Sequence, residues 1–234
     1  MYKSILLKIS GEALKDPSGH ILSPSTLTEI AKEIKQCVDT GIFVSVVVGA
    51  GNIWRGAIAE KLGMARVQAD YMGMLGTVIN SLALQEALGK VGQAAVVLSH
   101  LEVKKITEPF VQSKALEHLR DKKVVISAGG TGQPFFSTDT AAALVASSLG
   151  VDCILMAKNG VDGVYSADPK LDKSAKLFKE LTYSEIIEKN LKVVDKTAAA
   201  LCLENKISTL VFNMSKKGNI IKAASGEQIG TLVK

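Results

Sequence analysis

Short runs of apolar, largely β-branched residues recur along the chain, and segments with helical periodicity separate them. Each run has the length of a strand that is buried on both faces. Alternation of such strands with helices predicts an α/β fold, a three-layer αβα sandwich with a mostly parallel central sheet. The predicted strands are Ile5–Ile9, Phe43–Val48, Ala94–Leu98, Val124–Ile126, Cys153–Met156 and Ile207–Phe212.

The segment Leu27–Val38 has apolar residues at helical spacing. Thr26 and Glu29 have the spacing of a capping box at its start, and Gly41 is placed to end the helix. Further helices are predicted at Val67–Leu88, Thr138–Leu149, Ser184–Lys189, Lys196–Asn205 and Lys216–Ala224.

The chain has 234 residues, enough for one large domain or two small ones. Since no linker or low-complexity tract interrupts it, we expect one compact domain with two lobes and a boundary near Gly150. No apolar run approaches the ~18–20 residues of a membrane span, and Met1–Lys8 is too short and charged for a signal peptide. These features predict a cytoplasmic protein. The three cysteines are far apart and odd in number, which favours reduced thiols over disulfides or a zinc site.

The formal net charge is +5 and the isoelectric point is about 9.0. A basic balance is compatible with nucleic acid or with small phosphorylated ligands. Because the lysines are scattered and only one tryptophan is present, small anions are favoured and no nucleic-acid partner is expected. The histidines His20, His100 and His118 are isolated and receive no role.

Three glycine-rich segments follow predicted strands: Lys8–Gly11, Gly49–Asn52 and Ala128–Gly132. In open parallel sheets, ligands bind beyond the carboxyl ends of the strands. Glycine turns there let backbone N–H groups approach phosphate oxygens. Neither the P-loop motif nor the dinucleotide-binding glycine fingerprint is present, so a different arrangement must bind any nucleotide.

Charged residues accompany these turns. Lys8 ends a strand, where the alternative is a surface lysine, and Arg55 lies between a glycine turn and Gly56, where it suits bidentate phosphate contact. Asp139 follows Thr138, where the alternative is an acid at a helix N-terminus. Asp162 and Asp168 belong to the long, glycine-punctuated loop Lys158–Pro169, and loops of this length are often functional.

Together these segments resemble the amino-acid kinase superfamily and, within it, the bacterial UMP kinase family. The lysine motif and the Asp-Gly-Val-Tyr loop are shared across the superfamily, whereas Thr-Gly-x-Pro-Phe-Phe and Asp-x-Met-Gly-Met are narrower and indicate UMP. The matching segments are Lys8–Gly11, Gly49–Gly56, Asp70–Met74, Gly130–Asp139, Val161–Pro169, Leu191–Asp195 and Val211–Met214.

The resemblance implies an amino-acid kinase-like fold and a phosphotransferase that moves the γ-phosphoryl group of Mg-ATP to UMP in pyrimidine nucleotide biosynthesis. Residues 1–150 would bind UMP and residues 151–234 would bind ATP. Mg²⁺ would be held through the ATP phosphates rather than by dedicated protein ligands. The family also implies a homohexamer and allosteric feedback inhibition by UTP.

The resemblance assigns site residues position by position. The catalytic residues would be Lys8, Arg55, Asp139 and Asp195. ATP would be bound by Lys8, Ile9, Ser10, Gly11, Gly51, Arg55, Asn159, Tyr165 and Asp168. UMP would be bound by Ala50, Asp70, Thr131, Gly132, Gln133, Pro134, Phe135, Phe136, Ser137 and Thr138. Ala50 stands where the family usually has glycine, and Gln133 where asparagine is common.

Three other readings remain open. One is a related kinase whose acceptor is a carboxylate or a carbamate, for which the segment Thr131–Thr138 would be harder to explain. Another is a non-catalytic nucleotide-binding regulator, which would be expected to lack Lys8 or Arg55. The third is a dinucleotide-dependent dehydrogenase, against which the missing glycine fingerprint counts.

Overall fold

The computed structural model describes residues 1–16, 18–167, 171–172, 174–189, 191 and 193–234. Its strands are β1 (Ser4–Ile9), β2 (Phe43–Val48), β3 (Ala95–Ser99), β4 (Glu108–Pro109), β5 (Val124–Ala128), β6 (Cys153–Lys158), β7 (Glu180–Leu181), β8 (Ser208–Asn213) and β9 (Thr231–Val233). Its helices are the 3₁₀ helix η1 (Gly11–Leu14), α1 (Pro24–Asp39), α2 (Gly56–Lys61), α3 (Arg66–Lys90), α4 (Gln112–Arg120), α5 (Thr138–Leu149), α6 (Tyr183–Glu188), α7 (Lys196–Glu204) and α8 (Asn219–Ala224).

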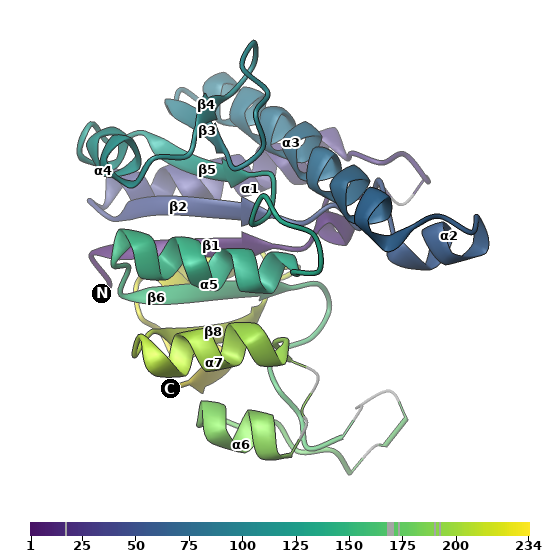
Figure 1. The fold of residues 1–234 in the computed structure, drawn as a ribbon. Coiled ribbons are helices and arrows are strands. Elements are labelled where there is room, and N and C mark those ends of the chain that lie inside the picture. The colour runs from purple at the N-terminus through teal and green to yellow at the C-terminus, as the bar shows by residue number, and fades with distance from the viewer. Residues whose placement is uncertain (17, 168–170, 173, 190, 192) are drawn as a thin grey trace.

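Within the described residues the strands form one nine-stranded sheet in the order β4-β3-β5-β2-β1-β6-β8-β9-β7 (Figure 1). Neighbouring strands are parallel except for β8 and β9, which pair antiparallel. The first strand therefore lies in the middle of the sheet, between β2 and β6. Because β1, β2, β5 and β6 run in the same direction, their carboxyl ends meet at one edge.

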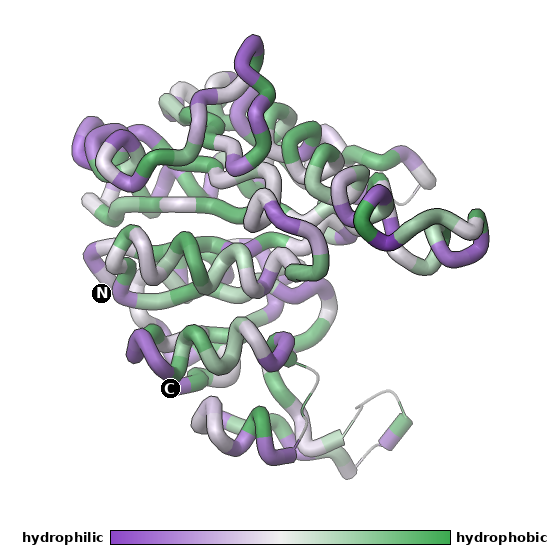
Figure 2. Tube along the Cα trace, in the orientation of Figure 1, coloured by the Kyte–Doolittle hydropathy of each residue, from purple (hydrophilic) through white to green (hydrophobic). Residues whose placement is uncertain are grey.

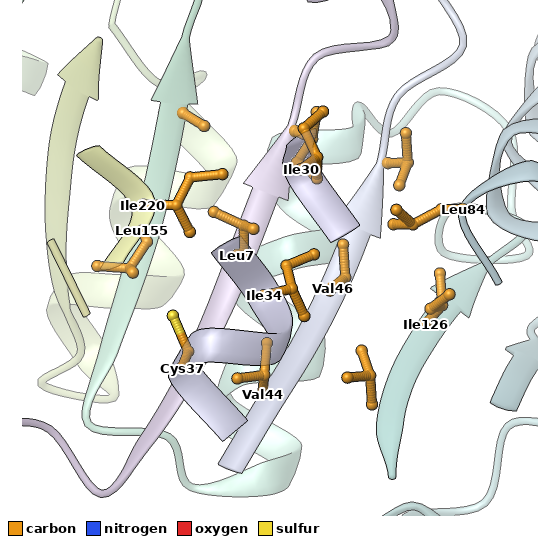
Figure 3. Close-up of a cluster of buried hydrophobic side chains, with 14 of the residues drawn as sticks. Leu7, Ile30, Ile34, Cys37, Val44, Val46, Leu84, Ile126, Leu155 and Ile220 are labelled. Carbon is orange, nitrogen blue, oxygen red and sulfur yellow. The ribbon is translucent and has the colours of Figure 1, made fainter. Parts of the chain in front are cut away.

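Helices cover both faces of the sheet, as predicted. On β1, Ile5, Leu7 and Ile9 belong to the core that packs against α1, α3 and α8. Figure 3 shows Leu7 in this core near Ile34 of α1 and Ile220 of α8. Leu6 points to the other core, which packs against α4, α5, α6 and α7. All four of these β1 side chains are completely buried. Strands that are apolar on both faces therefore build the αβα sandwich that their sequence predicts.

The start of α1 differs from the prediction. Ser23 is the N-cap residue, and its Oγ accepts a hydrogen bond from Thr26 N at 3.3 Å. Pro24 occupies the first helical position, where its fixed φ suits the helix and its missing N–H costs nothing. The predicted capping box of Thr26 and Glu29 was wrong, because the helix begins before both. Gly41 follows the helix at a φ of +89°, as predicted for a residue that ends it.

Several elements were not predicted. Helix α2 buries only Ala59, and α4 buries only Ala115 and Leu119, so neither has the apolar stripe that marks a helix in sequence. The strands β4, β7 and β9 are too short to show a two-residue alternation. Helix α8 was predicted from Lys216 but begins at Asn219, after Gly218 at a φ of +83°. No helix in the described part of the chain is both long and apolar enough to cross a membrane. Its three cysteines are free and buried, as expected.

Candidate active site

Lys8 lies on β1 near the carboxyl edge of the sheet, on the same face as Leu6. Its side chain is almost fully buried, and Nζ forms an ion pair of 2.5 Å with Oδ1 of Asp139. Asp139 belongs to the first turn of α5, whose N-terminus faces this edge. The alternative of a solvated surface lysine is thereby excluded, and a buried ammonium group lies next to the glycine turns.

The glycine turns after β1 and β2 pack directly against each other. A Cβ atom on Gly11 would lie 2.5 Å from the carbonyl oxygen of Gly49 and 2.7 Å from Gly51 N, so only glycine fits there. Two buried amides hold the second turn: Asn52 and Asn80 exchange side-chain hydrogen bonds of 3.0 and 2.8 Å, and Asn80 also donates to Gly49 O. Helix α3, which carries Asn80, thus fixes the shape of the turn.

Arg55 lies over the same turn. Its Nε donates to Gly51 O at 3.2 Å, and its Nη2 is 2.6 Å from Oε1 of Glu12. This contact raises the pKa of the guanidinium group. Glu12, on η1, was not singled out from the sequence, because nothing in its spacing ties it to Arg55. An anion that bound Arg55 here would compete with the Glu12 carboxylate.

A cavity of about 180 Å³ opens beside these turns, between α3 and the N-terminus of α5. Six of the residues assigned to UMP line it: Ala50, Asp70, Gln133, Phe136, Ser137 and Thr138. Four others from the same set are not among its lining residues: Thr131, Gly132, Pro134 and Phe135. Trp54, Met74 and Thr77 also line the cavity. Trp54 and Met74 belong to segments that match the family but were given no role of their own, and Thr77 was not singled out from the sequence.

Ala50, which replaces the usual glycine of the family, does not adopt a positive φ. Its methyl group packs against Gly76 on α3, where an added Cβ would lie 2.9 Å from the Cβ of Ala50. The glycine on α3 therefore makes room for the alanine in the turn. The turn can keep its backbone shape with this substitution.

The loop before α5 is held by Asp70, whose Oδ2 accepts a hydrogen bond of 2.8 Å from Phe135 N. Phe135 has a φ of +74°, a strained value for a residue with a side chain. The guanidinium group of Arg66 lies 5.3 Å from the centre of the Phe135 ring and 3.5 Å from the Asp70 carboxylate. Asp70 thus has a loop contact in this structure as well as a place in the cavity wall.

Asp195 caps α7 and connects it to the start of α5. It accepts hydrogen bonds from Ala198 N at 2.9 Å and from Thr140 Oγ1 at 3.1 Å, and the Ser137 hydroxyl also donates to it. Ser137 in turn caps α5 by accepting from the N–H groups of Asp139 and Thr140. The structure therefore brings Asp139 to Lys8, while Asp195 positions the helix that carries Asp139.

A second cavity, of about 370 Å³, lies between the end of β6 and helices α6 and α7. Asp139 and Asp195 line it together with Lys158, Val193 and Lys196. Lys158 was not assigned a role from the sequence. The signal was available, because Ile154, Met156 and Lys158 alternate along β6 and so share the face of the sheet on which Lys8 lies.

Of the remaining residues assigned to ATP, Asn159 directly follows β6. Asn159 Oδ1 accepts a hydrogen bond of 2.5 Å from Ser215 Oγ, and Asn159 lines a third cavity of about 410 Å³. Tyr165 forms an isolated β-bridge with Leu177. Ile9 is fully buried, so only its backbone can contact a ligand. Asp168 lies outside the described residues, while Asp162 forms an ion pair of 2.7 Å with Lys216.

A buried Lys-Asp pair, glycine turns and cavities at one edge of a parallel sheet describe a site for phosphorylated ligands. Residues 3–213 match the model of the amino acid kinase family, and the chain belongs to this family. It is 50% identical to a uridylate kinase from Pediococcus pentosaceus and 52% identical to one from Onion yellows phytoplasma, each match covering 100% of this chain and 97% of the relative. The crystal structure of UMP kinase from Bacillus anthracis superposes with a TM-score of 0.96 at 41% identity, covering 100% of this chain and 96% of that one.

Proposed function

We propose that the chain is a uridylate kinase, which transfers the γ-phosphoryl group of Mg-ATP to UMP and forms UDP in pyrimidine nucleotide biosynthesis. The main observation in support of this proposal is the buried Lys8–Asp139 ion pair at the edge of the sheet. Next to it lies the cavity that Ala50, Asp70 and Thr138 line. Full-length identity of about half to uridylate kinases favours this function over a carboxylate or carbamate acceptor.

The acceptor needs little chemical activation. The second pKa of a phosphate monoester is about 6, so the attacking oxygen of UMP is already ionised at pH 7. Phosphoryl transfer then depends on positioning and on neutralisation of charge. A side chain that removes a proton is not required, which fits a site built around a lysine and an arginine.

The donor side supplies the positive charge. Lys8 lies on β1 just before the first glycine turn, and Arg55 contacts the second at Gly51 O. The N–H groups of these turns can bind phosphate oxygens. Mg²⁺ bound with the nucleotide would supply further neutralisation, and Asp139 offers the carboxylate oxygens that this ion takes. Asp195 would keep Asp139 in place through α5. On this assignment, residues 1–150 form the UMP lobe and residues 151–234 the ATP lobe.

The direct test is a coupled assay of the purified protein with Mg-ATP and one acceptor at a time: UMP, CMP, glutamate, aspartate or carbamate. We expect turnover with UMP and much slower turnover with CMP. Equal turnover of UMP and CMP would contradict uridylate specificity. Turnover of a carboxylate or carbamate in place of UMP would assign the chain to another branch of the family. If no acceptor is turned over, the chain would instead be interpreted as a non-catalytic nucleotide-binding regulator.

Asp70→Asn is expected to raise the KM for UMP and to leave the KM for ATP and kcat nearly unchanged. Asp70 lines the cavity away from Lys8, where its carboxylate can accept hydrogen bonds from ribose hydroxyls. Loss of a contact that the ground state and the transition state share raises KM alone. Steady-state kinetics with each substrate varied in turn measures this, with Asp121→Asn on the surface as the control. Abolished kcat with normal UMP binding would place Asp70 in the chemistry.

We expect the protein to form a homo-oligomer, and a hexamer fits the family resemblance. Helix α3 carries hydrophobic residues along its length (Figure 2). Four of its apolar side chains are exposed, the last three of them three or four residues apart, although α3 also contributes to the core. They are Val67, Met72, Leu75 and Ile79. Light scattering over a wide range of protein concentrations measures the state, and a monomer throughout would refute this expectation. Inhibition by UTP and a cytoplasmic location belong to the same proposal.

A further inference from the structure

Lys158 is the last residue of β6, the strand that pairs with β1 on the side away from β2. Its side chain points to the same face of the sheet as Lys8 and lines the cavity of about 370 Å³ together with Asp139 and Asp195. An ammonium group at the edge of a sheet normally extends into water. Here the residue is only partly exposed.

The hydrogen bonds of Lys158 are incomplete within the described part of the chain. Its Nζ carries three donors. One of them meets the carbonyl oxygen of Val193 at 3.0 Å, and no carboxylate among the described residues lies within ion-pairing distance. Burial lowers the pKa of Lys158, the nearby Asp139 carboxylate raises it and the Lys8 ammonium lowers it. Lys158 thus belongs to the same charge cluster as the Lys8–Asp139 pair without being neutralised in it.

We propose that Lys158 binds the terminal phosphate groups of the nucleotide donor, in the cavity that it lines together with Asp139. This inference rests on the proposed function and deepens it. A polyphosphate in the cavity supplies the anionic oxygens that the two remaining donors of Lys158 need. Lys8, Lys158 and Lys196 outnumber the carboxylates of Asp139 and Asp195 at this edge, which leaves one positive charge that a nucleotide tail compensates and a neutral ligand does not.

The competing explanation is structural: Lys158 could serve only to hold Val193 and the start of α7 against β6. The two roles predict different results. A structural role affects stability and both substrates together, because Asp195, which follows closely, orders the start of α5. A phosphate-binding role affects the nucleotide donor and spares UMP. It also depends on charge rather than on the Val193 hydrogen bond.

The test compares Lys158→Met, Lys158→Arg and, as a surface control, Lys189→Met, which removes an exposed lysine paired with Glu185 on α6. Titration calorimetry measures ATP binding without acceptor and UMP binding without donor. For Lys158→Met we expect ATP affinity to fall at least tenfold and UMP affinity to stay within twofold of wild type. Lys158→Arg should recover most of the loss, and the control should match wild type. Steady-state kinetics should show a raised KM for ATP and a lowered kcat.

An ATP affinity within twofold of wild type, or equal losses for ATP and UMP, would overturn the inference. If Lys158→Met lowers the melting temperature, Lys158→Gln takes its place with the same expectation, because an amide retains an N–H donor without the charge. Binding of ATP is measured without turnover. Failure of the kinase proposal, seen as no turnover of UMP by the wild-type protein, is therefore distinguishable from failure at Lys158.

Discussion

Replacing Lys8 with methionine should lower kcat for UMP phosphorylation by about 10²- to 10³-fold, the usual effect of removing a preorganised group that stabilises charge in the transition state. Lys8 is buried at the edge where the glycine turns meet, so its ammonium acts without competition from water. The KM for UMP should change much less, since the cavity lined by Asp70 and Thr138 remains intact. Steady-state kinetics with both substrates measures the two effects.

The matched control for Lys8→Met is Lys35→Met, which removes an exposed lysine from an ion pair with Asp39 on α1. Exposed pairs of this kind contribute only about 0–1 kcal/mol. Lys35 lies near the C-terminal end of α1 and lines none of the three cavities at the site. The control should retain wild-type kcat. A wild-type kcat in Lys8→Met as well would mean that the buried ion pair is a structural feature and that another group neutralises the phosphate charge.

Asp139→Asn should impair both catalysis and stability. The change leaves the Lys8 ammonium buried without its carboxylate, and breaking a largely buried pair in this way costs about 3 kcal/mol or more. Lys8→Met should cost less stability, because the carboxylate it leaves behind lies in the first turn of α5, where the helix dipole favours negative charge. Urea unfolding of both variants measures the free energy of unfolding, and the loss should be larger for Asp139→Asn than for Lys8→Met.

Catalytic effects of the two changes should not add. If Asp139 acts by holding Lys8 in place, the double variant Lys8→Met, Asp139→Asn should have nearly the kcat of Lys8→Met. Fully additive losses would show that Asp139 acts on the substrate or the metal independently of Lys8. Ser137→Ala offers a further comparison, because it removes a cap of α5 and a contact to Asp195 without touching the pair.

Much of the fold is legible in the sequence because the central strands are buried on both faces. Runs such as Phe43–Val48 have few polar residues to obscure the pattern, and all six predicted strands are present within a residue or two. Elements that bury few side chains cannot be predicted from the pattern of apolar residues in this way. Helix α4 buries two residues, and the edge strand β7 has only two, so tertiary contacts rather than local pattern determine them.

The site divides along similar lines. Glycine turns after strands and the lysine on β1 are local features, and the structure brings Lys8 and Asp139 together. Contacts between segments that are distant in the sequence could not be predicted. The ion pair between Glu12 and Arg55, for example, depends on how η1 packs on the second glycine turn. Lys158 was missed because a lysine after an apolar run looks like the start of a loop. Its side-chain direction could have been predicted only from the two-residue alternation along β6, which puts Lys158 on the same face as Ile154 and Met156.

The central place of β1 also affects how the chain can be synthesised and divided. Strand β2 can pair with one edge of β1 early, but the other edge stays unpaired until β6, which begins at Cys153, has been made. Until then an apolar strand offers unpaired N–H and C=O groups, which is a template for association with other nascent chains. A fragment ending near Gly150 would keep that edge open permanently. Residues 1–150 and residues 151–234 thus meet where β1 pairs with β6, and cutting the chain between them would expose an unpaired strand edge on each part.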